Sequence, residues 1–311
     1  MSKPLVSIII PTFNRSHLIG QTLDSICSQT FNHWECIIVN DSSTDYTKEL
    51  LGFYVAKDSR IKYFDLPKGL PKGGNSCRNY GFSVCKGEYV NWFDDDDIMV
   101  SNKLSFQMKH LACSDLPFMV CQSLVFEGSI ENILGYRKSR IYSPDFFNDF
   151  VINEVKWLTQ APLIKKKFLL MNNISFNVKL YQSQERDYFV KILSLTMDYL
   201  HDSRALVLLR KHQESISYSK ADVKKQESNF FVNKNILKEY TSLLNADSKR
   251  YLLKSLKSSI RQAARYKNYK LCLQMLFQFT FLTTSKMKDV IKVLIGVIIL
   301  FFFNKGDKFF N

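Results

Sequence analysis

Four consecutive aspartates, Asp94, Asp95, Asp96 and Asp97, are the residues that most directly suggest chemistry in this chain. They follow residues 89–93, a short apolar run of the kind that forms a buried strand. Adjacent carboxylates repel one another, so such a cluster either faces water or is neutralised by a cation. Carboxylate oxygens are preferred ligands of Mg²⁺ and Mn²⁺, which are often held by one or two carboxylates plus substrate phosphates. The aspartates therefore indicate a metal site, with a solvated acidic turn as the alternative.

Two other strand ends carry polar residues that could lie beside these aspartates. Residues 5–10 and 34–39 are apolar runs, and a helical pattern follows each of them. Alternating strands and helices predict an α/β fold with a doubly wound, mostly parallel sheet flanked by helices. Right-handed crossovers place the loops 11–15, 41–45 and 94–97 at one edge of that sheet, where open α/β folds bind ligands. The first of these loops contains no glycine, which argues against a nicotinamide-binding Rossmann turn.

The composition sets further limits. The chain has 311 residues, of which 46% are hydrophobic, enough for one large domain or for a domain of roughly 200 residues with a smaller second one. Its seven cysteines form no CxxC pair and are odd in number. This pattern argues against a zinc site or a disulfide framework and favours a reducing compartment. The first apolar run is too short for a signal peptide, so we expect the chain to start in the cytoplasm.

The net charge of +14 is unevenly distributed. Residues 248–288 contain ten lysines and arginines and no acidic residue, which implies an anionic partner such as phospholipid, nucleic acid or a phosphorylated substrate. Residues 293–303 then form an apolar run with lysines on both sides, shorter than the roughly 18–20 residues that a membrane span needs. We therefore expect an in-plane or re-entrant membrane segment, or else a helix packed against the catalytic domain.

Several motifs follow one another in the first hundred residues. They are VSIIIPTFNR at 6–15, VNDSSTD at 39–45, GNSCRNYG at 74–81, KGEYV at 86–90 and then the aspartates. This ordered set resembles the N-terminal half of the family 2 glycosyltransferases, which have the GT-A fold. The resemblance implies inverting transfer of a sugar from a nucleotide-diphosphate sugar, with UDP as the most frequent nucleotide and Mn²⁺ or Mg²⁺ as cofactor.

The resemblance also implies roles for single residues near the nucleotide. Pro11, Phe13 and Asn14 would lie beside the nucleotide, Asp41 would contact its base, and Arg78 would lie near the diphosphate. From residue type alone, Phe13 could instead pack on the sheet, Asn14 could cap a helix, and Arg78 could be a surface charge. Asp41 could simply be a turn residue.

Within the aspartates, the resemblance aligns Asp94 with the ribose and Asp96 with the metal. Asp95 fills a variable position, and the additional carboxylate keeps Asp97 as an alternative metal ligand. His212 follows a short apolar strand and matches a histidine that reaches the metal or the diphosphate in many relatives. An isolated histidine is also often structural or exposed.

The catalytic base is expected at the start of a later helix. Asp187 directly precedes an apolar helical pattern, and the resemblance identifies it as the general base that takes the proton of the acceptor hydroxyl. Glu185, two residues earlier, is the alternative base. Arg186 stands where the family usually has an acid. Acidic residues are also favoured at any helix N-terminus, so an ordinary helix start is the other interpretation.

These features divide the chain into a catalytic domain, 1–218, and a basic, apolar helical extension, 219–311, that we expect to associate with a membrane. The acceptor is expected to be a glycan or lipid-linked glycan in bacterial surface polysaccharide assembly, with the enzyme peripheral on the inner face of the cell membrane. One alternative is an inactive sugar-nucleotide-binding scaffold at the membrane. A nucleic-acid-binding protein is less favoured, because the basic residues alternate with long apolar runs.

Overall fold

The computed structural model describes residues 6–212, 223–282 and 287–303. The chain divides into two compact units. The first contains Met1–Pro144, Val155–Val178 and Lys191–Tyr218, and the second contains Asp145–Glu154, Lys179–Val190 and Ser219–Asn311. The second unit thus includes two segments of the predicted catalytic domain. The predicted boundary at residues 218 and 219 itself lies outside the described residues.

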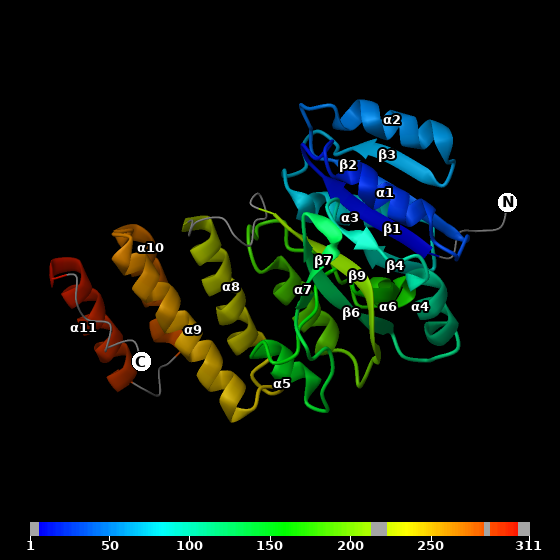
Figure 1. Cartoon of the computed structure of the whole chain (residues 1–311). Helices are drawn as coiled ribbons and strands as arrows, with labels where there is room; N and C mark the ends of the chain where they lie inside the picture. The colour runs from blue at the N-terminus through cyan, green and yellow to red at the C-terminus, as the bar shows by residue number, and fades with distance from the viewer. Residues whose placement is uncertain (1–5, 213–222, 283–286, 304–311) are drawn as a thin grey trace. The chain divides into compact units, whose positions relative to one another are not determined.

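The first unit is built on one sheet. Its strands are β1 Val6–Thr12, β2 Trp34–Asn40, β3 Ile61–Asp65, β4 Tyr89–Trp92, β5 Ile98–Met99, β6 Phe118–Glu127, β7 Ser129–Tyr136, β8 Pro162–Lys165 and β9 Leu200–Lys211. The described strands follow the order β3-β2-β1-β4-β8-β6-β9-β5, with β7 beside β6. Figure 1 shows β3, β2, β1 and β4 in this order. The first four of these are parallel, whereas β8 runs antiparallel to both β4 and β6. The predicted α/β fold is confirmed, with a parallel first half and a mixed second half.

The strands β1 and β2 are buried along almost their whole length. Every residue of β2 is buried, and so is every residue of β1 except Pro11, which explains their continuous apolar sequences. The predicted loop starts at Pro11, but Pro11 pairs with Val39 inside β1. Because β4 pairs with β1 only as far as Ile9, β1 has an open side beyond that point, where a residue without an N–H is tolerated.

Helices cover this sheet. They are α1 Ile19–Cys27, α2 Thr47–Lys57, α3 Gly74–Val84, α4 Lys103–Leu111 and α6 Lys166–Met171. The helix α3 approaches β1 very closely at Gly81, where an added Cβ would lie 2.5 Å from Cγ2 of Ile9. Only glycine permits that contact, so Gly81 sets the position of α3 and of Arg78 on it.

The second unit is helical. It contains α5 Phe146–Val151, the start of α7 Gln184–Leu193, and then α8 Val223–Glu239, α9 Ala246–Arg265, α10 Tyr269–Leu282 and α11 Met287–Phe303, which Figure 1 colours from yellow to red. Buried side chains of α9, α10 and α11 share one apolar core. Val293 and Val297 of α11 belong to this core, whereas Ile291 and Ile298 are about half exposed. Within the described residues, no helix combines the length and apolar character required to cross a membrane.

Candidate donor and metal site

The four aspartates lie in the turn between β4 and β5, at the carboxyl end of the parallel strands. Phe93 still donates a main-chain hydrogen bond to Ile9, so the turn starts directly at the sheet edge. Asp94, Asp96 and Asp97 each offer one carboxylate oxygen, and these three atoms lie within 4.8 Å of one another. The turn therefore gathers carboxylates rather than exposing them as a solvated acidic loop.

Arginine and glutamine side chains hold this turn in place. Nη2 of Arg78 donates to Oδ1 of Asp94 at 2.7 Å. Nε2 of Gln160 donates to both Asp94 and Asp97, at 2.7 and 2.5 Å. The main-chain N–H of Arg210, in β9, donates to Oδ1 of Asp97 at 2.8 Å. These contacts fix the aspartates from α3, from the segment before β8 and from β9.

His212 lies next to the aspartates, although it is far from them in the sequence. Its Nε2 is 2.8 Å from Oδ2 of Asp96. The side chains of both residues are about one-fifth exposed, so solvent reaches this pair. Arg210 donates from Nε to the main-chain oxygen of Asp96 and so aligns the end of β9 with the turn.

The electrostatics of the cluster favour a bound cation. Burial is the main cause that raises the pKa of Asp94, Asp95 and Asp97, and the nearby Asp96 carboxylate raises each of them further. The pKa of Asp95 reaches about 8. A divalent cation would restore the ionised forms, because an opposite charge favours them. Carboxylate oxygens suit Mn²⁺ or Mg²⁺, so the aspartates of the cluster fit the implied metal.

The loops after β1 and β2 are joined by side-chain hydrogen bonds. Oδ1 of Asn14 accepts from the main-chain N–H of Thr44 at 2.8 Å, and Asn14 adopts a left-handed backbone with φ of 52°. Burial opposes ionisation of Asp45, but hydrogen bonds from Thr47 and Ser16 outweigh it and lower the pKa of Asp45 to about 2. Asn14 therefore bridges two loops and does not cap a helix.

Asp41 has an unused acceptor atom. It directly follows β2 and is 8% exposed. Its Oδ2 accepts from the main-chain N–H of Gly73 at 2.7 Å, but Oδ1 is buried and has no hydrogen-bond partner among the described residues. A buried acceptor without a partner costs about 1–3 kcal/mol, so this oxygen is suited to accept a hydrogen bond from a ligand.

Phe13 and Arg78 do not take the alternative roles of a core aromatic and a surface charge that their residue types would allow. Phe13 is 52% exposed at the end of β1, so it does not pack into the sheet core. Arg78 is 7% exposed and is therefore no surface charge. Its guanidinium lies 5.3 Å from the ring centre of Phe176, and its Nε has no hydrogen-bond partner among the described residues. Arg78 is thus a buried cation attached to the aspartate turn.

The predicted base lies in the second unit. Asp187 and Glu185 are both in the first turn of α7, and Asp187 is buried whereas Glu185 is partly exposed. Arg186 donates from Nη2 to the main-chain oxygen of Val151, and its guanidinium lies 5.5 Å from the ring centre of Tyr251. Asp187 thus occupies a helix N-terminus, where the helix dipole favours a negative charge.

Sequence reasoning missed Gln160, which contacts the aspartates, and the buried residues that hold its segment in place. Gln160 follows no recognisable motif, and its role depends on the chain returning to the sheet at β8. Lys103 is fully buried, and its Nζ donates to Oε1 of Gln107 at 2.8 Å and to Oδ1 of Asn91 at 3.2 Å. Two signals could have found this group: Asn91 is a polar residue inside an apolar strand, and Lys103 and Gln107 are spaced to share one helix face.

The sheet has a parallel first half with carboxylates at its carboxyl edge and a mixed second half, and it matches the structures of GT-A glycosyltransferases. The structure of S. aureus TarS 1-349 in complex with UDP-GlcNAc matches with a TM-score of 0.66, over 96% of this chain and 91% of that one, at 17% identity. The mannosyltransferase PcManGT from Pyrobaculum calidifontis, in complex with GDP-Man and Mn²⁺, matches with a TM-score of 0.55, over 98% of this chain and 89% of that one, also at 17% identity. The GT-A fold is thereby confirmed.

The sequence identifies the family. The family model described as "Glycosyl transferase family 2" matches residues 7–191, and the chain belongs to this family. It is 35% identical over 120 residues to the Escherichia coli UDP-Glc:alpha-D-GlcNAc-diphosphoundecaprenol beta-1,3-glucosyltransferase WfgD, covering 38% of this chain and 46% of that protein. It is 40% identical over 106 residues to a Campylobacter jejuni GalNAc(5)-diNAcBac-PP-undecaprenol beta-1,3-glucosyltransferase, covering 34% of each. The matched segments span less than half the length of these relatives.

Proposed function

We propose that this protein is an inverting glycosyltransferase that moves a sugar from a nucleotide-diphosphate sugar, UDP being the preferred nucleotide, to an acceptor hydroxyl. The observation that carries the proposal is the carboxylate cluster of Asp94, Asp96 and Asp97, with His212 against Asp96 and the buried Arg78 against Asp94. Negative ligands for a cation and a buried positive charge stand side by side at a sheet edge that binds ligands in this fold class. A diphosphate bound together with a metal needs carboxylates to hold the cation and a positive charge to contact the phosphates.

The donor nucleotide would occupy the edge formed by the loops after β1 and β2. The unpartnered Oδ1 of Asp41 would accept a hydrogen bond from a donor group of the base, since an imide N–H supplies what a buried carboxylate oxygen lacks. The exposed ring of Phe13 and the neighbouring Pro11 offer apolar surface to the same nucleotide. Asn14 contributes by fixing the two loops relative to each other.

The metal would be held by Asp96 together with His212 and with Asp97 or Asp94. A bound Mn²⁺ or Mg²⁺ supplies positive charge against the diphosphate, which accumulates negative charge as it leaves. Arg78 adds a second positive charge at the same place without needing a metal, because its guanidinium is already oriented by Asp94. Asp95, largely buried beside Arg15, would complete the donor edge near the ribose together with Asp94.

Transfer with inversion needs a base that faces the acceptor. We assign this role to Asp187: its carboxylate takes the proton of the acceptor hydroxyl while that oxygen bonds to the anomeric carbon and the bond to the diphosphate oxygen breaks. The aspartates after β4 would hold the metal on the side of the leaving group, so they would not be available for this step. Glu185 is the rival base, two residues away in the same helical turn.

The acceptor is proposed to be a glycan or a lipid-linked glycan of a bacterial surface polysaccharide. The names of the E. coli and C. jejuni relatives both contain an undecaprenol-linked acceptor, which supports this class for the present chain. The half-exposed apolar residues of α10 and α11 and the basic residues of α9 support a peripheral position on the inner face of the cell membrane, where such acceptors are presented.

The metal and donor roles can be tested with one variant and its control. Asp96→Ala should abolish sugar transfer and remove Mn²⁺-dependent binding of UDP, measured by calorimetry with and without EDTA. Asp115→Ala, an exposed aspartate outside the cluster, should behave like the wild type. A screen of UDP-sugars for UDP release identifies the donor. Full turnover by Asp96→Ala, or by the wild type in EDTA, would contradict the metal role.

A further inference from the structure

The side chain of Gln160 joins two of the four aspartates to each other. Its Nε2 carries two hydrogens and donates to Oδ2 of Asp94 at 2.7 Å and to Oδ2 of Asp97 at 2.5 Å. Ionised carboxylates only accept hydrogen bonds, so the amide can face them only with its NH₂ group. Oγ1 of Thr159 donates to Oε1 of Gln160 at 3.4 Å, and Gln160 is 1% exposed. One buried amide group therefore fixes the separation of the two carboxylates.

The two carboxylates joined by this amide accept hydrogen bonds through their other oxygens as well. Oδ1 of Asp94 accepts from Nη2 of Arg78, and Oδ1 of Asp97 accepts from the main-chain N–H of Arg210. All four oxygens of these two carboxylates thus accept a hydrogen bond from the protein. Asp96 lies between the two in the sequence, so the amide fixes the turn on both sides of it.

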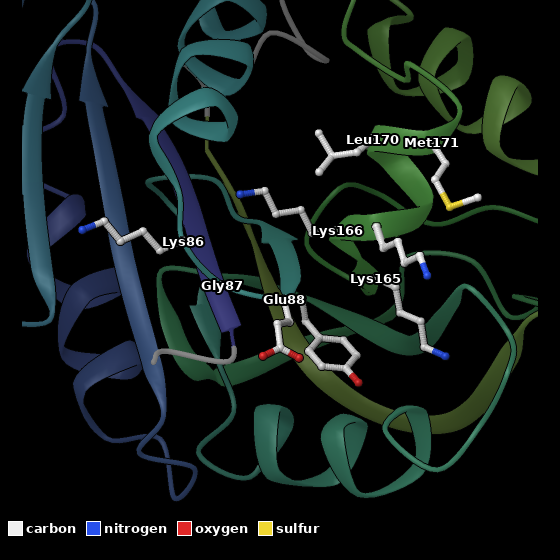
Figure 2. Close-up of a pocket in the computed structure, with 9 residues that line it drawn as sticks. Lys86, Gly87, Glu88, Lys165, Lys166, Leu170 and Met171 are labelled. Atoms are coloured by element: carbon white, nitrogen blue, oxygen red, sulfur yellow. The ribbon is translucent and has the colours of Figure 1, made fainter. Parts of the chain in front are cut away.

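The pairing of β4 with β8 brings Gln160 to the turn. These strands are antiparallel, and Tyr89 of β4 lies opposite Lys165 of β8. Figure 2 shows this end of the pair, with Glu88 just before β4 and Lys165 at the end of β8. The start of β8 therefore lies toward the end of β4, and Gln160, two residues before β8, comes beside the aspartates that follow β4.

Two fully buried amide side chains hold the main chain of residues 160–162. Nδ2 of Asn91 donates to the main-chain oxygens of Gln160, at 3.0 Å, and of Pro162, at 2.7 Å. Nε2 of Gln107 donates to the main-chain oxygen of Ala161 at 2.9 Å. Three consecutive carbonyl groups are thus bound from β4 and α4, and these bonds fix the position from which the side chain of Gln160 extends.

Lys103 determines which way these two amides face. Its Nζ donates to Oδ1 of Asn91 at 3.2 Å and to Oε1 of Gln107 at 2.8 Å. An ammonium group has donors and no acceptor, so each amide must turn its oxygen toward Lys103 and its NH₂ group toward residues 160–162. The buried charge of Lys103 thereby orients the groups that hold the segment of Gln160.

We propose that Gln160 is a positioning residue that preorganises the aspartate turn for the divalent cation, and that Lys103 acts on the same turn through the two amides that it orients. Carboxylates this close together repel one another, so a turn that is not held would spread and would have to be ordered again by the cation. Groups that hydrogen-bond metal-ligating side chains typically change metal affinity by about 10–100-fold. The inference rests on the proposed function, because it takes the aspartates to be the metal site.

Mn²⁺ binding to the full chain without nucleotide tests this role, and EPR of the free Mn²⁺ measures it without any sugar turnover. Gln160→Met nearly keeps the side-chain volume but cannot donate, so it should weaken Mn²⁺ binding by about 10–100-fold. The matched control is Gln122→Met. It removes another buried amide of the same sheet, which donates to the main-chain oxygen of Ser139 and not to the aspartates, and it should keep the wild-type affinity.

Two further variants separate positioning from a loss of stability. Gln160→Asn keeps the amide on a side chain that is one methylene shorter, so it tests the reach of this group even if Gln160→Met is unstable, and it should also weaken Mn²⁺ binding. Lys103→Met should weaken Mn²⁺ binding less than Gln160→Met does, because it acts through the two amides. Leu300→Ala, which removes buried apolar atoms from the helical core, should leave the Mn²⁺ affinity unchanged.

The outcomes distinguish this inference from the metal role itself. If the wild type does not bind Mn²⁺, the aspartates are no metal site and both fail. If the wild type binds Mn²⁺ and Asp96→Ala does not, but both Gln160 variants keep the wild-type affinity, the metal role stands and this inference alone is overturned. It is also overturned if Gln122→Met loses as much affinity as Gln160→Met, since the effect would then be a general one of removing a buried amide.

Discussion

Lys103 links the stability of the protein to the support of the aspartate turn. It is fully buried in α4, and its ammonium group donates to the side chains of Asn91 and Gln107. These two amides donate in turn to main-chain oxygens of residues 160–162, the segment that presents Gln160 to the aspartates. No carboxylate of the described residues pairs with Lys103, so hydrogen bonds alone stabilise its buried charge.

Burial lowers the pKa of Lys103 from its ordinary value of 10.5 to about 8 and outweighs the opposing effect of Cys121. Between these two pH values the unfolded chain binds more protons than the folded one, so the free energy of unfolding rises with pH across this window. Across the whole window the free energy of unfolding rises by about 3 kcal/mol, and about 2 kcal/mol of this rise falls between pH 7 and pH 9.5.

Replacing Lys103 by Met removes the titrating group while nearly keeping its volume. Urea unfolding at pH 7 and pH 9.5 should show that the wild type gains about 2 kcal/mol relative to Lys103→Met over this interval. The comparison cancels every other group that titrates in both proteins. Lys109→Met, at an exposed position of the same helix, should track the wild type at both pH values. If Lys103→Met and the wild type change equally with pH, Lys103 is not a buried, depressed amine and the argument fails.

Three other predictions address the base, the sheet and the helical unit. Asp187→Asn should lower turnover by about 10²–10⁴-fold with little change in UDP affinity, whereas Glu185→Gln should stay active; the reverse pattern would make Glu185 the base. Gly87→Ala should destabilise the protein by about 1–3 kcal/mol in urea unfolding, while Gly52→Ala, with open space around its Cα, should not destabilise it. Leu300→Ala should cost about 2–5 kcal/mol and Ile298→Ala about 0.5 kcal/mol or less, because only Leu300 is buried; equal costs would refute the packing of α11.

The sequence could predict the part of the site that depends on local pattern. Apolar runs that end in polar residues identify strand ends, and the crossover rule brings such ends to one edge. The loops 41–45 and 94–97 could be placed at one edge in this way, whereas the choice of Asp41 and Asp96 within them came from the resemblance. The contact of His212 with Asp96 needed the resemblance as well, because a histidine at the end of a late strand has no local signal of its own.

The rest of the site depends on contacts between distant segments. Gln160 reaches Asp94 and Asp97 because β8 returns antiparallel to β4, a pairing that no local pattern encodes. Arg210 reaches the same turn because β5 pairs with β9. The burial of Arg78 depends likewise on how closely α3 packs on β1. Gly81 permits this close packing, but a glycine in the sequence does not by itself predict it.

The apolar run near the C-terminus shows why composition alone left two interpretations open. Val293, Val297 and Leu300 are spaced for one helix face and are buried against α9 and α10, while Ile291, Leu294 and Ile298 lie on a face that is two-fifths to one-half exposed. Both faces are apolar, so the sequence carries no amphipathic pattern that would separate the packed side from the open one. The packed face makes α11 part of the helical core, and the open face leaves apolar surface available for a membrane. The core that α11 joins is that of the helical extension, so packing against the catalytic domain stays a prediction, as does membrane contact through the open face.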